Sequence, residues 1–310
     1  MAFHPRSDSS AGDIYSRFGG TAAVSDRRES VDPSILLEQV DKTMRKLVTH
    51  PFPSAAQRAA LHHFDAGGGR FRARLAIDAG LALRLAPEQI IAVAAAVELV
   101  HNASLVHDDL QDRDRDRRDA PAVWVAFGDS VAICAGDLML SAAYAALAST
   151  GSAAAALIDL MHRRVTRLIR GQDADLSGLA TSLDLAAYES IAAAKSGPLL
   201  ALPIEFCLML TEHSQSCELA AECGRHFSLG YQMFDDLRDL SDDRGKSALN
   251  AVLVLSALGV KDAEDSVRRM AVEHFKHAAN LTGQLPLNCG RLLADKSHQL
   301  GASLSKERDR

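Results

Sequence analysis

The stretch that decides the fold is PEQIIAVAAAVELVHNASLVHDD, residues 87–109. It opens with a proline, which favours the first turn of a helix, and continues through apolar residues with few interruptions. Such a helix is apolar on almost every face, and in a globular protein it belongs at the centre of a bundle. Because the run ends in acidic residues, we predict a central helix that carries carboxylates at its C-terminal end.

Other long Ala/Leu-rich segments follow, separated by Gly, Pro, Asp or Ser. Alternating Val/Ile/Thr runs with hairpin dipeptides, the usual signals of strands, do not occur. We therefore predict an all-α fold, a single large helical bundle over residues 31–305, behind a flexible leader over residues 1–30. The first helix should begin after a capping Asp32, with Pro33 at its first position. In the apolar segment around Lys195 we expect the pair Gly197–Pro198 to break the helix.

Composition and charge exclude several classes of protein. The chain has 310 residues and a formal charge of −6, from 34 basic and 40 acidic residues, which does not suit a general nucleic-acid binder. Five cysteines without a CxxC pair, and a start without an apolar signal core, indicate a reduced, cytoplasmic location. We also expect no membrane span, because we find no apolar run that approaches the roughly 18 residues required.

Two aspartate triads have the same spacing. One ends the run quoted above, and the other follows the apolar YQMF at residues 231–234; their members are Asp108, Asp109 and Asp112, and Asp235, Asp236 and Asp239. On a helix this spacing places all three carboxylates on one face, where like charges repel. A hard divalent cation would neutralise them, and Mg²⁺ prefers oxygen ligands completed by water and substrate phosphates. One triad could be a solvated helix end, but two, 127 positions apart (235 − 108), predict a metal–diphosphate site.

Basic residues supply the other half of such a site. The segment GGGRFRARL, residues 67–75, combines glycines that admit an anion to the backbone with arginines that bind phosphate. His101 lies seven residues before Asp108, about 10 Å along the same helix face, and is either a core residue or a ligand. Lys195 stands inside an apolar segment, so we expect it to reach an anion.

In order and spacing, these motifs resemble those of the trans-isoprenyl diphosphate synthases, the polyprenyl synthetase family. The resemblance runs from about residue 60 to 250 and rests on GGGRFRARL, HNASLVHDDLQDRDRDRRDAP, GQDADL, AKSGPLL and GYQMFDDLRD. It implies a bundle of the isoprenoid synthase type, usually homodimeric, with a central cavity between the acidic clusters. It also implies the 1'-4 head-to-tail condensation of an allylic diphosphate with isopentenyl diphosphate.

The resemblance further implies roles for individual residues. Three magnesium ions, replaceable by manganese, would bind the allylic diphosphate through Asp108, Asp109, Asp112, Asp235 and Asp239, with Asp236 and Lys195 also in the catalytic set. The same diphosphate would contact Arg117, Lys195 and Gln232. Isopentenyl diphosphate would bind Arg72, His101 and Arg118. Gln172 and Asp175 occupy the position of the family's GQxxDL motif, which lines the cavity.

Product length depends on the positions before the first triad. In the family, a bulky aromatic four or five residues before it limits the product to fifteen carbons, whereas here these positions are Ser104 and Ala103. Val100 and Ala96 follow on the same face, and one helical turn of about 5.4 Å is comparable with one isoprene unit. We predict a product of twenty carbons or more, with geranylgeranyl diphosphate favoured, unless another helix supplies the floor.

Three departures from the family pattern leave other functions open. Gly69 replaces a lysine, Ala73 replaces a proline, and the loop after Asp239 is short; the compensating candidates are Arg70, Arg74, Arg244 and Lys246. One alternative is a class I terpene cyclase or a non-elongating prenyl transferase, which the missing lysine at Gly69 favours. The second triad, Arg72 and the Arg117–Arg118 pair argue against it. The other is a non-catalytic partner subunit, against which both intact triads argue.

Overall fold

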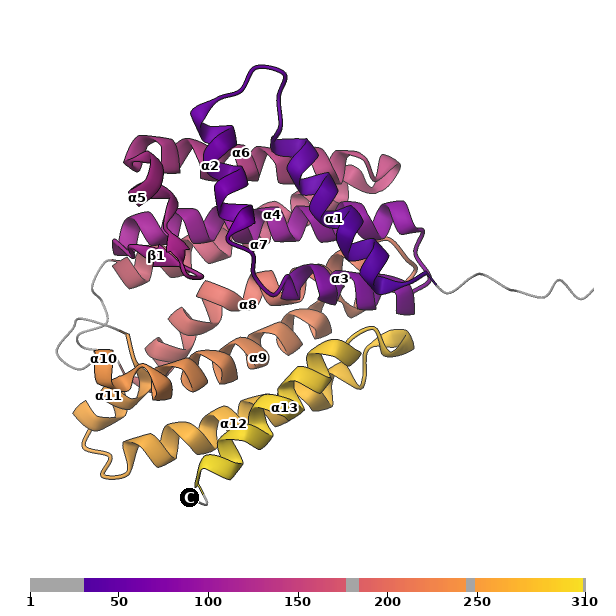
Figure 1. The fold of residues 1–310 in the computed structure, drawn as a ribbon. Coiled ribbons are helices and arrows are strands. Elements are labelled where there is room, and N and C mark those ends of the chain that lie inside the picture. Colours follow the sequence, from indigo (N-terminus) through magenta and orange to yellow (C-terminus); the bar gives the residue numbers. More distant parts are fainter. Residues whose placement is uncertain (1–30, 177–183, 244–248, 309–310) are drawn as a thin grey trace, which may run out of the picture. The chain divides into compact units, whose positions relative to one another are not determined.

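The fold is built almost entirely from helices (Figure 1). The computed structural model describes residues 31–176, 184–243 and 249–308, so the predicted leader (1–30), Arg244 and Lys246 lie outside the described residues. From Val31 onward the described residues form one compact unit. The elements are α1 (Pro33–Val48), α2 (Ala55–Asp65), α3 (Phe71–Ala82), α4 (Pro87–Asp112), β1 (Asp116–Arg117), β2 (Ala120–Pro121), α5 (Val123–Phe127), α6 (Asp129–Ala148), η1 (Gly151–Ala153), α7 (Ala154–Leu176), α8 (Leu185–Met209), η3 (Ser214–Ser216), α9 (Cys217–Arg238), α10 (Leu240–Asp243), α11 (Ala251–Ala257), α12 (Ala263–Thr282), η4 (Pro286–Asn288) and α13 (Arg291–Arg308).

The first helix begins as predicted. The Asp32 carboxylate accepts a hydrogen bond from the Ser34 backbone N–H at 2.8 Å, and Pro33 occupies the first turn. Such a cap satisfies a backbone donor that has no partner inside the helix. The first helix is therefore fixed by local sequence.

The predicted central helix is α4, and α8 is a second one. α4 packs most extensively on α6 and also on α3 and α1, whereas α8 lies between α7 and α9. In Figure 1, α8 separates the layer of α4 and α6 from that of α9, α12 and α13. Buried Ala, Val and Leu side chains fill α4 from Ile90 to Val106, and others fill α8 from Ile191 to Leu208. Burial on all sides explains their apolar composition.

The expected break at Gly197–Pro198 is wrong, because α8 continues through Pro198 and Pro203. Each proline removes a backbone hydrogen bond and costs about 3 kcal/mol in a helix interior. Neighbours such as Leu200 and Leu202 are buried, and each such side chain contributes about 1.5–3 kcal/mol. Packing therefore outweighs the local penalty and carries the helix past both prolines.

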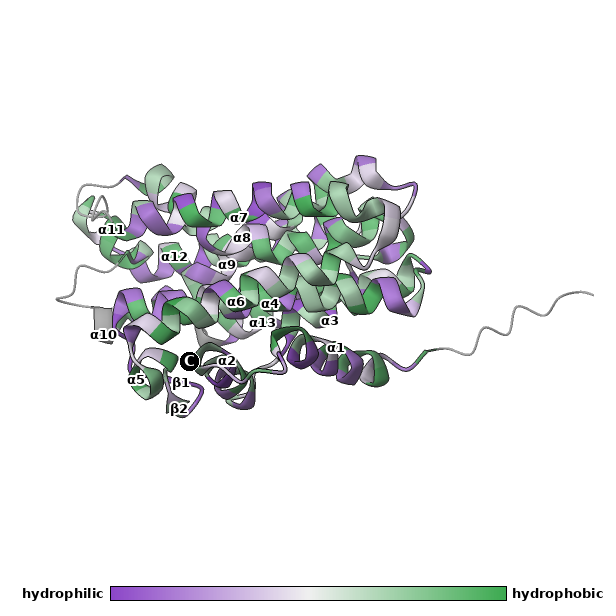
Figure 2. Ribbon diagram, turned by 90° about the horizontal axis from the view of Figure 1, so that it is seen from above, coloured by the Kyte–Doolittle hydropathy of each residue, from purple (hydrophilic) through white to green (hydrophobic). Residues whose placement is uncertain are grey.

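The expectation that no segment reaches the length of a membrane span is also wrong. By length and composition, three helices among the described residues are apolar enough to cross a bilayer, namely α4, α6 and α8. Their most apolar stretches are 72%, 44% and 83% buried, respectively. Burial among other helices explains the composition of α4 and α8. Figure 2 shows that α6 is rich in hydrophobic residues, and two of its large apolar side chains, Ile133 and Tyr144, are exposed.

A short hairpin follows α4 that the sequence did not predict. Strands β1 and β2 pair antiparallel, Asp116 with Pro121 and Arg117 with Ala120. The two turn residues, Arg118 and Asp119, have φ values of 56° and 62°. Left-handed backbone at both positions belongs to a type I′ turn, which normally takes Asn-Gly. The hairpin aims Arg118 at the glycine-rich turn before α3.

Candidate active site

The two aspartate triads repeat one pattern of burial. Their first members, Asp108 and Asp235, are half-buried, and their last members, Asp112 and Asp239, are exposed. The middle members are enclosed: Asp109 is 0% and Asp236 is 3% exposed. Each triad stands at the C-terminal end of its helix, α4 or α9.

Other protein groups donate hydrogen bonds to the middle carboxylates, Asp109 and Asp236. Arg117 donates from Nε to Asp109 Oδ1 at 2.8 Å and makes a second contact to the same oxygen. Asp236 accepts from the Tyr188 hydroxyl at 2.6 Å, the Ala251 N–H at 2.7 Å and Gln232 Nε2 at 2.9 Å. Arg117 and Gln232, both predicted to contact the allylic diphosphate, are thus engaged by the triads themselves. The sequence did not indicate this anchoring, because Tyr188 and Ala251 come from other elements.

The first carboxylates are poorly stabilised as anions. Burial raises the pKa of Asp108 to about 6, with neighbouring Asp112 and Asp109 adding to the rise. Burial and the adjacent Asp239 and Asp236 raise the pKa of Asp235 to about 7. A bound divalent cation would reverse both shifts, because it favours the charged form.

The donor set fits magnesium that a ligand completes. Asp109 Oδ2 is buried without a hydrogen-bond partner. No three His, Cys, Asp or Glu side chains among the described residues are close enough to hold an ion by themselves. Magnesium usually binds one or two carboxylates and takes its other oxygens from water and substrate phosphates. The outer aspartates of the triads have the chemistry for that role.

One face of α8 reaches both triads. Lys195 Nζ lies 2.5 Å from Asp175 Oδ2 of α7, so the anion that this lysine was expected to reach is Asp175. Burial raises the pKa of Asp108 and Asp112, and the nearby Lys195 charge opposes that rise. Tyr188, which binds Asp236, lies seven residues earlier, about 10 Å along the same helix face. The second triad therefore contacts α8 directly, whereas the first is influenced by the charge of Lys195 on the same helix. The other residue of the predicted GQxxDL motif, Gln172, donates to Gln111 at 3.1 Å.

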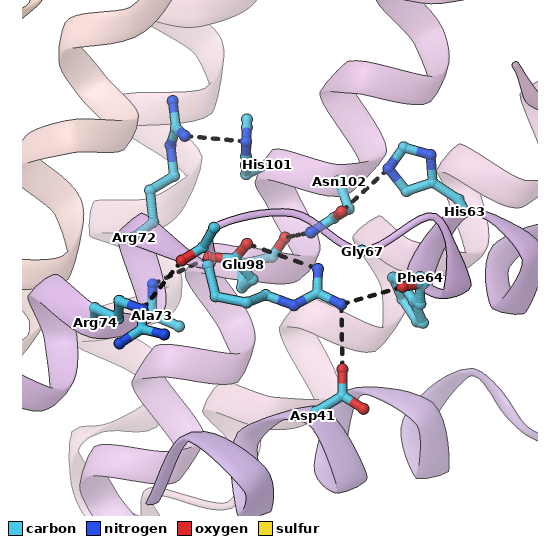
Figure 3. Close-up of polar contacts among 12 residues, drawn as sticks. Asp41, His63, Phe64, Gly67, Arg72, Ala73, Arg74, Glu98, His101 and Asn102 are labelled. Atoms are coloured by element: carbon cyan, nitrogen blue, oxygen red, sulfur yellow. Dashed lines mark hydrogen bonds and ion pairs between the residues drawn. The ribbon is translucent and has the colours of Figure 1, made fainter. Parts of the chain in front are cut away.

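A cationic cluster lies where α3, α4 and the hairpin meet. Arg72 and His101 point toward each other, with 3.0 Å between an Arg72 terminal nitrogen and His101 Nε2 (Figure 3). Burial, together with Arg72 and Arg118, lowers the pKa of His101 well below its usual range, so its imidazole is neutral. Arg72 Nε is buried without a hydrogen-bond partner. These donors suit an anionic ligand.

The glycine-rich turn receives Arg118. The Arg118 guanidinium donates to the carbonyl oxygen of Gly67. Gly68 has a φ of 123°, and a Cβ there would lie 2.5 Å from the Arg118 guanidinium carbon. Glycine at position 68 therefore provides both the backbone conformation and the room for the guanidinium.

A single buried carboxylate supports this cluster, and the sequence analysis missed it. Glu98 is 2% exposed and accepts from the Ala73 backbone N–H at 3.0 Å (Figure 3). A terminal nitrogen of Arg70 lies 3.9 Å from the Glu98 carboxylate. Arg70 also donates to Asp41 of α1 at 3.1 Å. Glu98 precedes His101 by one helical turn, which is the signal that could have revealed it. Arg70, Arg72 and Arg118 against Glu98 and Asp41 still leave the cluster positive, as an anion site requires.

The residues predicted to set product length lie inside the bundle. Ala103 and Val100 are 0% and 1% exposed. Ser104 is half-buried, and its hydroxyl donates to the His101 carbonyl at 2.8 Å. All three stand on α4 where it packs against its neighbours, and none is bulky.

The family model for polyprenyl synthetases matches residues 53–251. A (2E,6E)-farnesyl diphosphate synthase of Mycobacterium tuberculosis is 35% identical over 215 residues, 67% of this chain and 59% of that protein. A geranylgeranyl diphosphate synthase of Methanosarcina mazei is 31% identical over 207 residues, 65% of this chain and 64% of that protein. The chain thus spans about three fifths of the length of these curated relatives.

Solved structures share the fold at lower identity. A geranylgeranyl pyrophosphate synthetase from the archaeon Geoglobus acetivorans superposes with a TM-score of 0.78 at 23% identity, covering 86% of this chain and 98% of the other. A decaprenyl diphosphate synthase from Rhodobacter capsulatus gives a TM-score of 0.79 at 17% identity, covering 87% and 97%. From the family match and the identities, the chain belongs to the polyprenyl synthetase family.

Proposed function

We propose that this protein is a magnesium-dependent trans-prenyltransferase that condenses an allylic diphosphate with isopentenyl diphosphate, head to tail. The supporting observation is the division of charge across the site. The second triad contacts α8 through Tyr188, and the charge of Lys195 on the same helix acts on the first triad. Arg72, His101 and Arg118 form a separate cluster beside the first triad. One half suits a diphosphate carried by metal ions and the other a diphosphate held by guanidinium groups.

In the proposed reaction, Asp108, Asp112, Asp235 and Asp239 would hold magnesium, which would supply charge stabilisation for the departing diphosphate. Lys195 leaves Asp175 for this diphosphate and steadies the charge that develops as the allylic C–O bond ionises. Arg72, Arg118 and the neutral His101 orient the isopentenyl diphosphate so that its double bond attacks the allylic carbon. The released diphosphate then takes the proton that restores a double bond. Apolar side chains of α4 and α8 exclude water from the cation.

We propose a product of twenty carbons or more, with geranylgeranyl diphosphate favoured. The relatives named above include both farnesyl and geranylgeranyl diphosphate synthases, so the family alone does not decide. Support comes from the small side chains at 103, 104 and 100 of α4, which offer no barrier to a growing chain. Ala103→Phe is expected to shorten the product, as measured by chromatography of the dephosphorylated alcohols. An unchanged product would place the floor on another helix.

We also propose that the protein is a homodimer joined through α6. This helix has the highest mean hydropathy of the three long apolar helices, 1.7, yet 44% of its apolar stretch is buried. Ile133 and Tyr144 on α6 are 49% and 38% exposed, an unusual cost for a monomer. A second copy would cover this face. Sedimentation velocity is expected to give a dimer, and Ile133→Glu is expected to give monomers.

An incubation with magnesium and dimethylallyl, geranyl or farnesyl diphosphate, with and without isopentenyl diphosphate, tests the activity. A longer prenyl diphosphate that needs both substrates supports the proposal. A hydrocarbon or alcohol from the allylic substrate alone would identify a cyclase or non-elongating enzyme, and no turnover would identify a partner subunit. Asp108→Ala and Asp235→Ala are expected to abolish turnover and to leave the helical circular dichroism unchanged.

A further inference from the structure

The middle carboxylate of the second triad differs from its neighbours in having many protein donors. Asp236 is 3% exposed, and its oxygens accept from Tyr188 Oη, Ala251 N and Gln232 Nε2 at 2.6, 2.7 and 2.9 Å. Its backbone carbonyl accepts from Asn250 Nδ2 at 2.9 Å. These partners belong to α8, α9 and the start of α11, so the aspartate ties three parts of the chain together.

Tyr188 is the donor that links this aspartate to α8. Its side chain is fully buried, and burial together with Asp236 raises its pKa, so the phenol remains a donor. A buried hydroxyl placed on a carboxylate makes a strong, charge-assisted hydrogen bond. The same α8 face carries Lys195 two turns later, beside the first triad. The Tyr188 hydrogen bond therefore joins the helix end that carries the second triad to the helix that carries Lys195.

We propose that Tyr188 is a positioning residue for the metal-binding end of the site, acting through Asp236 on Asp235 and Asp239. This inference rests on the proposed function. Tyr188 is neither a proposed metal ligand nor a proposed substrate contact, and its role is to hold Asp236 in place. Groups that orient metal ligands typically change metal affinity by 10–100-fold when removed. A loss of that size in binding, with the fold intact, is the signature expected for Tyr188.

Calorimetric titration of the full-length protein with inorganic pyrophosphate, at a fixed magnesium concentration, measures this directly and needs no turnover. Tyr188→Phe is expected to weaken binding about tenfold or more. Thr49→Val, which removes an exposed hydroxyl that donates to the Arg45 carbonyl at the end of α1, is the matched control and is expected to bind like the wild type. Thermal unfolding of each variant shows that the titration is performed on folded protein.

Asp236→Asn completes a double-mutant cycle. If the phenol acts through the carboxylate, Tyr188→Phe adds little to the loss caused by Asp236→Asn. Asp236→Asn alone, with a similar loss expected, gives the test if Tyr188→Phe does not fold. Binding by Tyr188→Phe within twofold of the wild type, or fully additive losses, would overturn the inference. A wild-type protein that binds no pyrophosphate with magnesium would overturn the proposed function instead.

Discussion

At the scale of single residues, Gly67 and Gly68 provide a matched pair. Both have positive φ, 78° and 123°, so alanine strains the backbone at either position. Only at position 68 would the new Cβ meet Arg118, whereas nothing lies within 4 Å at position 67. Gly68→Ala is expected to raise the KM for isopentenyl diphosphate at least tenfold more than Gly67→Ala, as steady-state kinetics would show. Equal effects would mean that Arg118 does not bind this substrate.

Gly69 stands where the motif resemblance leads us to expect a lysine. Its backbone φ lies outside the left-handed region, and a Cβ there would meet nothing within 4 Å, so the position accepts a side chain. A new hydrogen bond to a charged group contributes about 1.5–3 kcal/mol, or roughly a 10–150-fold change in binding. Gly69→Lys is therefore expected to lower the KM for isopentenyl diphosphate, and the neutral Gly69→Gln is the control. An unchanged KM in both variants would show that the other basic side chains of the cluster already bind the isopentenyl diphosphate fully.

At the scale of elements, the contact between α7 and α8 depends on Gly171. A Cβ there would lie 2.8 Å from Ala194 Cβ and 2.9 Å from the Ala194 backbone carbon, so the helices would have to separate. Overpacking of this kind costs about 1–3 kcal/mol, and here it would also displace Lys195 from Asp175. Gly171→Ala is expected to lower the unfolding midpoint in urea and to lower kcat.

Gly301 in α13 is the control for this substitution. Its nearest neighbour to an added Cβ is Phe275 Cβ at 3.6 Å, an ordinary contact. Alanine in a helix interior is about 1 kcal/mol more favourable than glycine. Gly301→Ala should therefore raise the unfolding midpoint. The same direction of change in both variants would contradict the proposed close approach of α7 and α8.

Elements also differ in how far the sequence predicts them. The apolar run of α4 and the cap of α1 carry their own local signals, and both were predicted correctly. The continuity of α8 past Pro198 and the left-handed turn at Arg118–Asp119 depend on contacts with distant segments, so local rules failed there. The triads could be found by spacing, but the anchoring of Asp236 could not, because its partner Tyr188 lies 48 positions away.

At the scale of the whole molecule, buried histidines make stability depend on pH. Burial, with Arg118 nearby, lowers the pKa of His63 from 6.5 to about 3. Between these values the unfolded chain binds a proton that the folded chain does not. The free energy of unfolding therefore falls as the pH drops below 6.5, by about 1.4 kcal/mol per pH unit for one such group. Burial lowers the pKa of His274 to about 4, with the same sign.

His63→Gln is expected to remove this contribution, because glutamine does not titrate. Its amide can still donate to Asn102, the present partner of His63 at 3.1 Å. Urea unfolding at pH 7, 6 and 5 should show the wild type losing about 0.7 kcal/mol between pH 7 and 6, and about 1.2 kcal/mol between pH 6 and 5, relative to the variant. The raised pKa values of Asp108 and Asp235 act in the opposite direction but are common to both proteins, so they cancel in the difference. The exposed His298→Gln is the control, and a wild-type slope in His63→Gln would contradict the assignment.

The separation of Tyr188 and Lys195 along α8 has a consequence for inhibitors. The helix rises about 10 Å between these two residues, and it does not shorten when a smaller ligand binds. Their spacing therefore stays fixed. A compact anion such as orthophosphate can bind near only one end of this helix segment. An anion with two charged groups, joined by a linker that matches this separation, can bind near both triads at once. Once one group is bound, the linker raises the effective concentration of the other. Varying the linker in a series of bis-anions would therefore measure the spacing of the two ends in solution.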